Sequence, residues 1–266
     1  MNKFLIILGA VFLLYLLVCL GVYVFQQKFI FYPQKGSQPP PDDLNITEHY
    51  ITNADGQQLH AWWMPVDTGA LTVLFFHGNA GNVSRGEKRM RLLREMGFNA
   101  LAVDYRGFGI STGTIDNEDE IYEDARASYD YLQKKFGIKE DRIIIWGWSL
   151  GGAVAIDLAQ NKKCHALVME ATFYSMLDMA NRTFWYLPNR LTLNFDFSSG
   201  EKLSNVTCPI LFIHSREDKT VPYVQGEKLF AKCQEKKKFI EISGDHNHGL
   251  FDSKEKFIPE ALPFLK

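Results

Sequence analysis

The chain has no marked excess of charge, few cysteines and no internal repeat. Its 29 Lys and Arg against 31 Asp and Glu give a net charge of −2, so it lacks the basic surface typical of nucleic-acid binding. The four cysteines, Cys19, Cys164, Cys208 and Cys233, show no paired spacing, which argues against a zinc site and against a disulfide scaffold. Cys164 and Cys208 precede neighbouring expected strands, so a bridge between them is an alternative if the domain faces an oxidising compartment. We expect no cofactor, no metal and no nucleic-acid partner.

Charged side chains are also missing from one long stretch near the N-terminus. Residues 4–25 are apolar throughout, and a helix of that length, rising about 1.5 Å per residue, is long enough for the ~30 Å hydrocarbon core of a bilayer. The run is longer than the apolar part of a cleaved signal peptide, and no small-residue cleavage site follows it. The sequence therefore predicts an uncleaved, single-pass transmembrane anchor over residues 1–28 and a short stiff linker over residues 29–43. Lysines flank the run on both sides, so the side of the membrane that the domain occupies stays open.

The remaining residues, 44–266, have the pattern of one α/β domain. Short apolar runs alternate with longer amphipathic segments, as in a mostly parallel sheet flanked by helices. A turn at Asp55-Gly56 joins the first two runs, so the sheet is expected to open with antiparallel strands. Eight strands are expected, at residues 50–52, 59–63, 71–76, 99–103, 142–146, 166–169, 208–214 and 238–242. Helices are expected near residues 87–95, 118–135, 150–159 and 224–232.

The most informative motif is Gly147-Trp148-Ser149-Leu150-Gly151, which lies between a continuous apolar run and a helix of small residues. A Gly-x-Ser-x-Gly motif at a strand-to-helix junction holds its serine in a strained turn, where the flanking glycines leave room for the backbone. Ser149 is therefore predicted to present its hydroxyl above the sheet as a nucleophile. The amide of Leu150, at the start of the following helix, points to the place where an oxyanion would form.

A candidate acid follows the serine in the chain, directly after an expected strand. Asp218 comes after the strand at residues 208–214, at the edge where open α/β sheets place their functional groups. Its role would be to hold a histidine in one tautomer and to stabilise the imidazolium. Glu170, which ends the strand that begins at Ala166, is the rival acid, and we favour Asp218.

The candidate base follows the last expected strand, where His246 and His248 compete. A base is needed because a free serine hydroxyl is a poor nucleophile at neutral pH. Asp245, His246 and His248 could instead be read as metal ligands, but no third ligand cluster or cysteine pair supports that interpretation. A nucleophile, an acid and a histidine thus occur in sequence order, each at the end of an expected strand.

Several segments carry a resemblance to a known family. They are FFHGNAGN at residues 75–82, DYRGFG at 104–109, EATF at 170–173, DKTVP at 218–222 and His246-Asn247. Over nearly its whole length the chain resembles a membrane-tethered α/β-hydrolase family that includes the fungal bud-emergence hydrolases and the animal α/β-hydrolase domain-containing depalmitoylases. The resemblance implies an α/β-hydrolase fold and a serine hydrolase with an N-terminal anchor. The family-like spacing of Gly244, His246 and Asn247 favours His246 as the base.

The same resemblance gives a role to His77-Gly78-Asn79. This segment is similar to the loop after the third strand of α/β-hydrolases, whose backbone amide completes the oxyanion hole, and by position that amide belongs to Asn79. We interpret His77 as a structural residue that holds the loop. Residues 174–207 lie where such hydrolases insert a small cap, and the aromatic side chains there either line an acyl pocket or pack as core.

Together these residues predict a serine hydrolase that cleaves carboxylic ester or thioester bonds of acyl substrates, with Ser149, His246 and Asp218 as the catalytic residues. A serine peptidase or amidase with the same triad, and a non-catalytic membrane scaffold, are the alternatives. The expected partners are the acyl ester or thioester substrate and, through the N-terminal helix, a membrane. The oligomeric state stays open.

Overall fold

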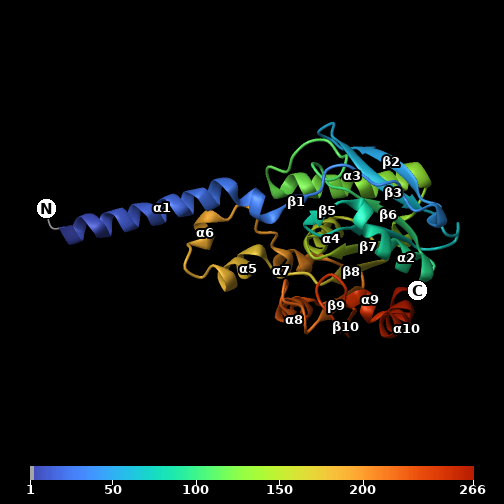
Figure 1. Cartoon of the computed structure of the whole chain (residues 1–266). Coiled ribbons are helices and arrows are strands. Elements are labelled where there is room, and N and C mark those ends of the chain that lie inside the picture. The colour runs from blue at the N-terminus through green and yellow to red at the C-terminus, as the bar shows by residue number, and fades with distance from the viewer. Residues whose placement is uncertain (1–2) are drawn as a thin grey trace.

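An eight-stranded sheet forms the centre of the protein, whose computed structural model describes residues 3–266 (Figure 1). The strands are β2 Thr47–Thr52, β3 Gln58–Met64, β4 Thr72–Phe76, β6 Asn99–Val103, β7 Ile143–Trp148, β8 Ala166–Glu170, β9 Ile210–Ser215 and β10 Lys237–Ile242. Across the sheet their order is β2-β3-β6-β4-β7-β8-β9-β10. β3 runs antiparallel to both of its neighbours, and all other neighbouring strands are parallel. The predicted fold, a mostly parallel sheet of eight strands with an antiparallel start, is thus confirmed.

Helices cover both faces of the sheet and bury it in two separate cores. In β7, Ile143 and Ile145 belong to one core and Ile144 and Trp146 to the other, because successive side chains of a strand point to opposite faces. All four are buried, which explains why this strand is a continuous apolar run. One face carries α3 Glu118–Phe136, α4 Leu150–Asn161 and α8 Tyr223–Lys232; the other carries α2 Glu87–Glu95 and α10 Lys254–Leu265. Shorter segments are α9 Gly249–Asp252 and the 3-10 turns η1 Asp42–Leu44, η2 Val83–Gly86 and η3 Glu140–Arg142.

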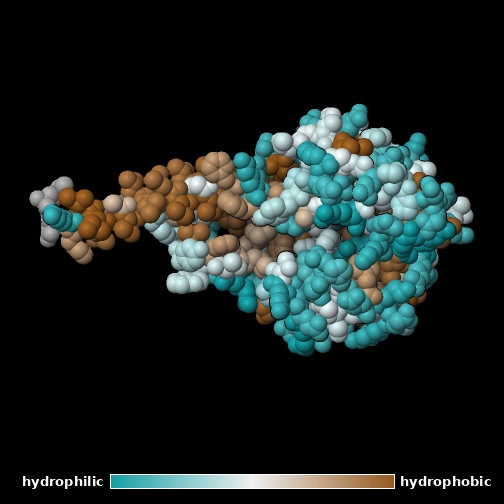
Figure 2. Space-filling model, in the orientation of Figure 1, coloured by the Kyte–Doolittle hydropathy of each residue, from teal (hydrophilic) through white to brown (hydrophobic). Residues whose placement is uncertain are grey.

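The N-terminal helix α1, Lys3–Ile30, extends away from the sheet (Figure 1). Most of its apolar side chains are exposed, so that it presents a hydrophobic surface, brown in Figure 2. By length and composition α1 is able to cross a membrane, a test that an N-terminal signal sequence would also satisfy. Met1 and Asn2, which belong to the predicted anchor, lie outside the described residues.

The segment 29–43, expected to be a linker, is bound to the domain over its first part. Tyr32–Pro33 form strand β1, which pairs in parallel with β5, Ala80–Gly81. The side-chain amide of Asn82 donates to the carbonyl of Gly36 at 2.8 Å. A two-residue strand has no periodicity, which is why the sequence pattern did not predict β1.

The expected cap, residues 174–207, contains short helices between β8 and β9. They are α5 Met176–Thr183, α6 Asn189–Thr192, α7 Ser199–Lys202 and the 3-10 turn η4 Leu203–Asn205. Its aromatic side chains fall into two groups. Phe195 and Phe197 are buried and pack against Phe31, with ring centroids 5.3 and 6.4 Å away. Trp185, in contrast, is 79% exposed.

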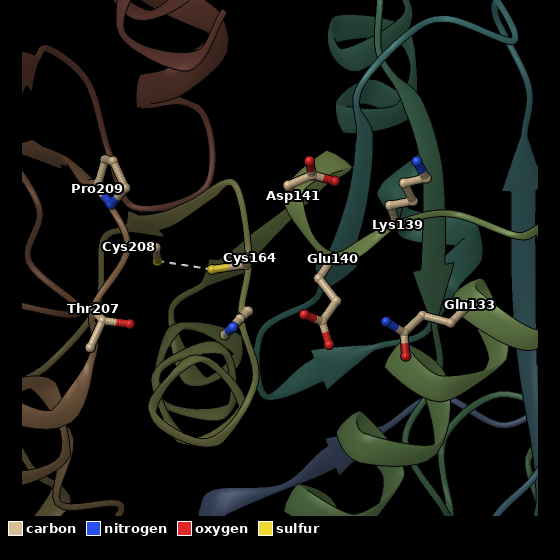
Figure 3. A pocket seen from close by; sticks show the side chains of 9 residues that line it. Gln133, Lys139, Glu140, Asp141, Cys164, Thr207, Cys208 and Pro209 are labelled. Carbon is tan, nitrogen blue, oxygen red and sulfur yellow. Dashed lines mark hydrogen bonds between the residues drawn. The ribbon is translucent and has the colours of Figure 1, made fainter.

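A polar pocket of about 750 Å³ lies at the opposite edge of the sheet from Ser149, where β7, β8 and β9 begin (Figure 3). Cys164 and Cys208 face each other in its wall as thiols, with their sulfur atoms 2.8 Å apart. The hydrogen bond to Cys208 and burial together raise the pKa of the Cys164 thiol. The raised pKa makes Cys164 a poor nucleophile at neutral pH, whereas the short distance between the two sulfur atoms allows a disulfide once an oxidant has activated one of them.

We expect a mild thiol oxidant to join Cys164 and Cys208 in a disulfide, with loss of two hydrogens from the intact protein. The two residues are 44 positions apart, and closing such a loop restricts the unfolded chain enough to stabilise the fold by up to about 4 kcal/mol. Mass spectrometry and thermal unfolding before and after oxidation measure both effects. Cys233→Ser is the matched control and should retain them, whereas folded protein that forms no bridge would contradict the prediction.

Candidate active site

Ser149 lies in the sharp turn between β7 and α4 that the glycine motif predicts. Its φ of 55° and ψ of −119° are strained for a residue with a side chain. A Cβ at Gly147 would lie 2.0 Å from the carbonyl oxygen of Gly151, and one at Gly151 would lie 2.1 Å from that of Phe76. Only glycine fits at these two positions, because α4 approaches β4 and β7 through backbone atoms.

The structure brings the three predicted catalytic side chains into contact. His246 Nε2 lies 3.0 Å from Ser149 Oγ, and His246 Nδ1 lies 2.6 Å from Asp218 Oδ2. All three side chains are buried within the protein. In this arrangement the imidazole can accept the serine proton at Nε2 while its Nδ1–H donates to the carboxylate.

Asp218 is held as a charged acceptor. The amides of Thr220 and Val221 both donate to its Oδ1 at 2.8 Å, and His214 Nε2 lies 3.4 Å from its Oδ2. Burial alone raises the pKa of this carboxyl, but hydrogen bonds from His214 and His246 outweigh burial and hold the pKa well below its ordinary value. Asp218 is therefore ionised at neutral pH. His214, at the end of β9, was not singled out from the sequence.

The rival acid Glu170 is engaged elsewhere. Its carboxylate accepts from Arg89 at 2.5 Å and from the indole of Trp146 at 3.1 Å, and all three residues are buried. The Arg89 guanidinium also lies 3.9 Å from the centre of the Trp148 ring, and Trp148 Nε1 donates to the His246 carbonyl at 3.3 Å. Through its contact with Arg89, which packs on Trp148, Glu170 thus supports the loop that carries His246. Asp218 is the acid that contacts the His246 imidazole.

The rival base His248 lies on the surface and faces Asp245. Its Nδ1 is 3.0 Å from Asp245 Oδ1, and its side chain is 55% exposed. His246 is therefore the histidine that the fold brings to Ser149, the predicted nucleophile. Among the residues that the structure describes, no three His, Cys, Asp or Glu side chains gather in a way that could hold a metal ion.

The loop after β4 brings Asn79 close to the serine. A Cβ at Gly78 would lie 3.5 Å from Ser149 Cβ, so the residue before Asn79 passes directly beside the nucleophile. Within residues 3–266, the amides of Asn79 and Leu150 have no internal acceptor. Leu150 is the first residue of α4, so its amide carries the partial positive charge of a helix N-terminus. Both amides are free to donate to a substrate oxygen, which is the role predicted for them.

A buried network beneath this loop was not found from the sequence. Asp104, at the end of β6, accepts from the Val83 amide at 2.6 Å and lies 3.4 Å from His60 Nδ1. It also lies 3.3 Å from His77 Nε2, a contact that is electrostatic because it is poorly aligned for a hydrogen bond. Burial raises the pKa of Asp104, but its contacts with His60 and His77 outweigh burial and lower it. His77, whose Nδ1 donates to the Gly78 carbonyl at 2.7 Å, holds the loop from within.

Asn79 is also bound to the end of α1, a contact that no sequence pattern indicated. Its side-chain amide donates to the Ile30 carbonyl at 2.8 Å, and its own carbonyl accepts from the Tyr32 amide at 2.8 Å. Ile30 is the last residue of α1, and Tyr32 begins β1. The N-terminal helix is therefore joined directly to the loop that carries the Asn79 amide.

Comparisons with known proteins place the chain in a family. Residues 85–265 match the model of the prolyl oligopeptidase family. The α/β-hydrolase domain-containing protein WAV2 of Arabidopsis thaliana is 31% identical over a gapped alignment of 271 positions that covers 91% of this chain and 88% of WAV2. The chain belongs to the prolyl oligopeptidase family of α/β-hydrolases. The YfhR protein of Escherichia coli K12 is 30% identical to this hydrolase over 82% of the chain and 79% of YfhR.

Solved structures show the same fold. The Pyrococcus furiosus esterase Pf2001 matches with a TM-score of 0.73 at 23% identity, over 89% of this α/β-hydrolase and 98% of the esterase chain. An α/β-hydrolase from Vibrio vulnificus matches with a TM-score of 0.67 at 20% identity, over 86% of this chain and 96% of the other. The resemblance seen in the sequence is thus confirmed at the level of the α/β-hydrolase superfamily. Membership of its membrane-tethered, depalmitoylase-like branch stays a prediction.

For this α/β-hydrolase we expect Asn79→Ala to lower kcat on a short soluble ester. The loop loses its bond to Ile30, so the Asn79 amide is held less firmly, and a loss of about tenfold is expected because removing a whole oxyanion donor costs roughly 10²–10³. Asn79→Asp keeps the size of the side chain but turns an acceptor toward the Ile30 carbonyl, and kcat should fall at least as far. Steady-state kinetics with p-nitrophenyl acetate measure both variants. An unchanged kcat in both would show that the contact does not position the amide.

Proposed function

We propose that this chain hydrolyses carboxylic esters or thioesters of acyl groups through a covalent acyl-enzyme. The observation that carries the proposal is the unbroken line of contacts from Asp218 through His246 to Ser149. In this proposal Ser149 is the nucleophile, His246 the general base and acid, and Asp218 the group that fixes the imidazole tautomer. The amides of Asn79 and Leu150 donate to the oxyanion.

In the first half-reaction Ser149 Oγ attacks the carbonyl carbon while His246 Nε2 takes the serine proton. The tetrahedral intermediate places its negative oxygen at the amides of Asn79 and Leu150, each worth roughly 3 kcal/mol in comparable sites. Collapse breaks the bond to the leaving oxygen or sulfur, which takes the proton from His246 and departs as an alcohol or thiol. Water then attacks the acyl-serine with His246 again as base, and the carboxylic acid is released from Ser149.

The proposed substrates are acyl groups held at a membrane, with α1 as an uncleaved single-pass anchor. The Tyr15 hydroxyl of α1 donates to the Tyr186 carbonyl of the cap at 2.9 Å, so the cap lies along the helix. Trp185, which precedes Tyr186, and Leu191 of α6 are 79% and 81% exposed. Exposed aromatic and aliphatic side chains next to an apolar helix are typical of a membrane interface. Such an anchor would keep the site beside lipid-like substrates.

Two rival functions can be distinguished from the proposed one by the substrates that the protein cleaves. A peptidase or amidase, which the name of the matching family favours, would cleave an aminoacyl amide in preference to an acyl ester. A non-catalytic membrane scaffold would cleave neither and would not react with a fluorophosphonate. We expect the full chain, solubilised in detergent, to hydrolyse acyl esters and thioesters and to leave the matched amide largely intact.

Labelling and kinetics of three variants test the nucleophile and the base. Ser149→Ala should abolish fluorophosphonate labelling, and His246→Ala should lower kcat by roughly 10⁶, because nucleophile and base act as a unit. His248→Ala is the matched control, since His248 is exposed and faces Asp245, and its kcat should change little. Residual labelling of Ser149→Ala, or an equal loss in the two histidine variants, would contradict the assignment.

A second pair of variants distinguishes the acid from its rival. Asp218→Asn should lower kcat by roughly 10⁴ through the wrong histidine tautomer while the protein stays folded. Glu170→Gln should instead lower the Tm, because breaking a buried ion pair with Arg89 costs about 3–5 kcal/mol, and kcat of the folded protein should fall far less. Calorimetry measures the Tm of both variants, and steady-state kinetics measure their kcat. The reverse pattern would assign the role of the acid to Glu170, at the end of β8.

A further inference from the structure

An apolar chamber of about 440 Å³ lies between the end of α1 and the cap helices α5 and α6. Val22, Phe29 and Ile30 of α1 contribute one wall, and Met179 and Phe184 of the cap contribute another. Figure 1 shows α6 beside α1, with α5 packed next to α6. The volume is within the range of roughly 300–1,000 Å³ that is typical of small-molecule sites.

The chamber offers a ligand mainly carbon atoms, and within the described chain no charged side chain lines it. Two amide side chains in its wall are satisfied by the protein itself. Gln26 donates to the Thr192 carbonyl at 3.1 Å and accepts from the Asn194 amide at 2.7 Å. Asn189 donates to the Phe184 carbonyl at 2.9 Å. Because these polar groups are already paired, the lining favours an apolar chain over a polar or charged ligand.

Two residues of the chamber lining are hydrogen-bonded to the loop that carries Asn79. Ile30 and Tyr32, which both line the chamber, are the residues hydrogen-bonded to Asn79. Asn79 follows Gly78, whose Cβ position lies 3.5 Å from Ser149 Cβ. Two residues of the chamber wall thus hold Asn79, and Gly78, the residue before it, lies beside Ser149.

The cap, which contributes one wall of the chamber, also carries exposed apolar side chains. Trp185 and Leu191 of the cap are exposed, and Arg182 and Arg190 stand near them in the sequence. Aromatic, aliphatic and arginine side chains together are typical of the bilayer interface. Figure 2 shows the hydrophobic surface of α1 continuing onto the domain at their junction. A chain that belongs to a lipid could therefore move from the bilayer into the chamber along apolar surface.

We propose that this chamber binds the acyl chain of a membrane-embedded ester or thioester, with the anchor helix as one of its walls. The inference rests on the proposed acyl-hydrolase function. It adds where the acyl chain of the substrate lies and which part of the protein selects its length. The anchor is then part of the substrate site as well as a tether. Because each added methylene leaves water, kcat/KM should rise about fourfold per methylene until the chamber is full.

The test compares two positions one turn apart on α1, in the full chain in phosphatidylcholine vesicles. Val22 lines the chamber, whereas Val18 is 47% exposed and does not. Val22→Phe fills the chamber, and Val18→Phe adds the same ring outside it as a matched control. For each variant kcat/KM is measured on the acetyl, butanoyl, octanoyl and dodecanoyl esters of p-nitrophenol. Fluorophosphonate labelling of Ser149 verifies that each variant is folded.

We expect Val22→Phe to lower the ratio of octanoyl to acetyl kcat/KM by about tenfold or more, the equivalent of losing roughly two buried methylenes. Val18→Phe should keep the wild-type ratio. Met179→Ala, which enlarges the chamber from the cap side, should move the preferred chain to a longer one.

A wild-type ratio in Val22→Phe, or an equal loss in Val22→Phe and Val18→Phe, would overturn the assignment of the chamber. The wild-type protein tests the proposed function separately. If the wild-type protein hydrolyses no acyl ester, acetyl included, and Ser149 takes no label, then the acyl-hydrolase function has failed, and the chamber assignment fails with it.

Discussion

The close approach of α4 to strands β4 and β7 is the constraint on which the site depends. Gly147 and Gly151 let backbone contact backbone, and the turn between them holds Ser149 at a positive φ. The same turn directs the Ser149 hydroxyl away from the sheet. It also directs the Leu150 amide, the first of α4, toward the position predicted for the oxyanion. A side chain at either glycine would push α4 outward and displace Ser149 and the Leu150 amide together. One steric requirement therefore sets two parts of the site.

Three acidic side chains, at or near the carboxyl ends of three strands, show how environment assigns roles. Asp104 faces two imidazoles beneath the oxyanion loop, Glu170 faces a guanidinium, and Asp218 faces the imidazole that reaches the serine. All three are buried, and a buried carboxylate needs a charged or hydrogen-bonding partner. The partner, rather than the position at a strand end, distinguishes the carboxylate that contacts the His246 imidazole from the two that support loops.

The strands and the serine turn could be predicted because their signals are local: a β-branched run and a pair of glycines around Ser149. The choice between His246 and His248 is harder, since the two stand in one short loop with similar neighbours. The family-like spacing favours His246, and the folded loop adds the physical distinction, with the His246 imidazole inward and the His248 imidazole toward solvent. The bond from Asn79 to Ile30 joins segments 49 residues apart and leaves no periodic pattern, so no local reasoning could have found it.

The junction of α1, β1 and Asn79 leaves little room for a hinge between the helix and the reacting serine. A domain on a loose tether samples many heights and tilts above a bilayer. Here hydrogen bonds on both sides of Asn79 join α1 to the domain. If α1 is the proposed anchor, its depth in the bilayer would set the depth at which Ser149 could reach a bond. Two lipids with identical acyl chains, but with their carbonyls at different distances from the bilayer centre, would be told apart by position alone.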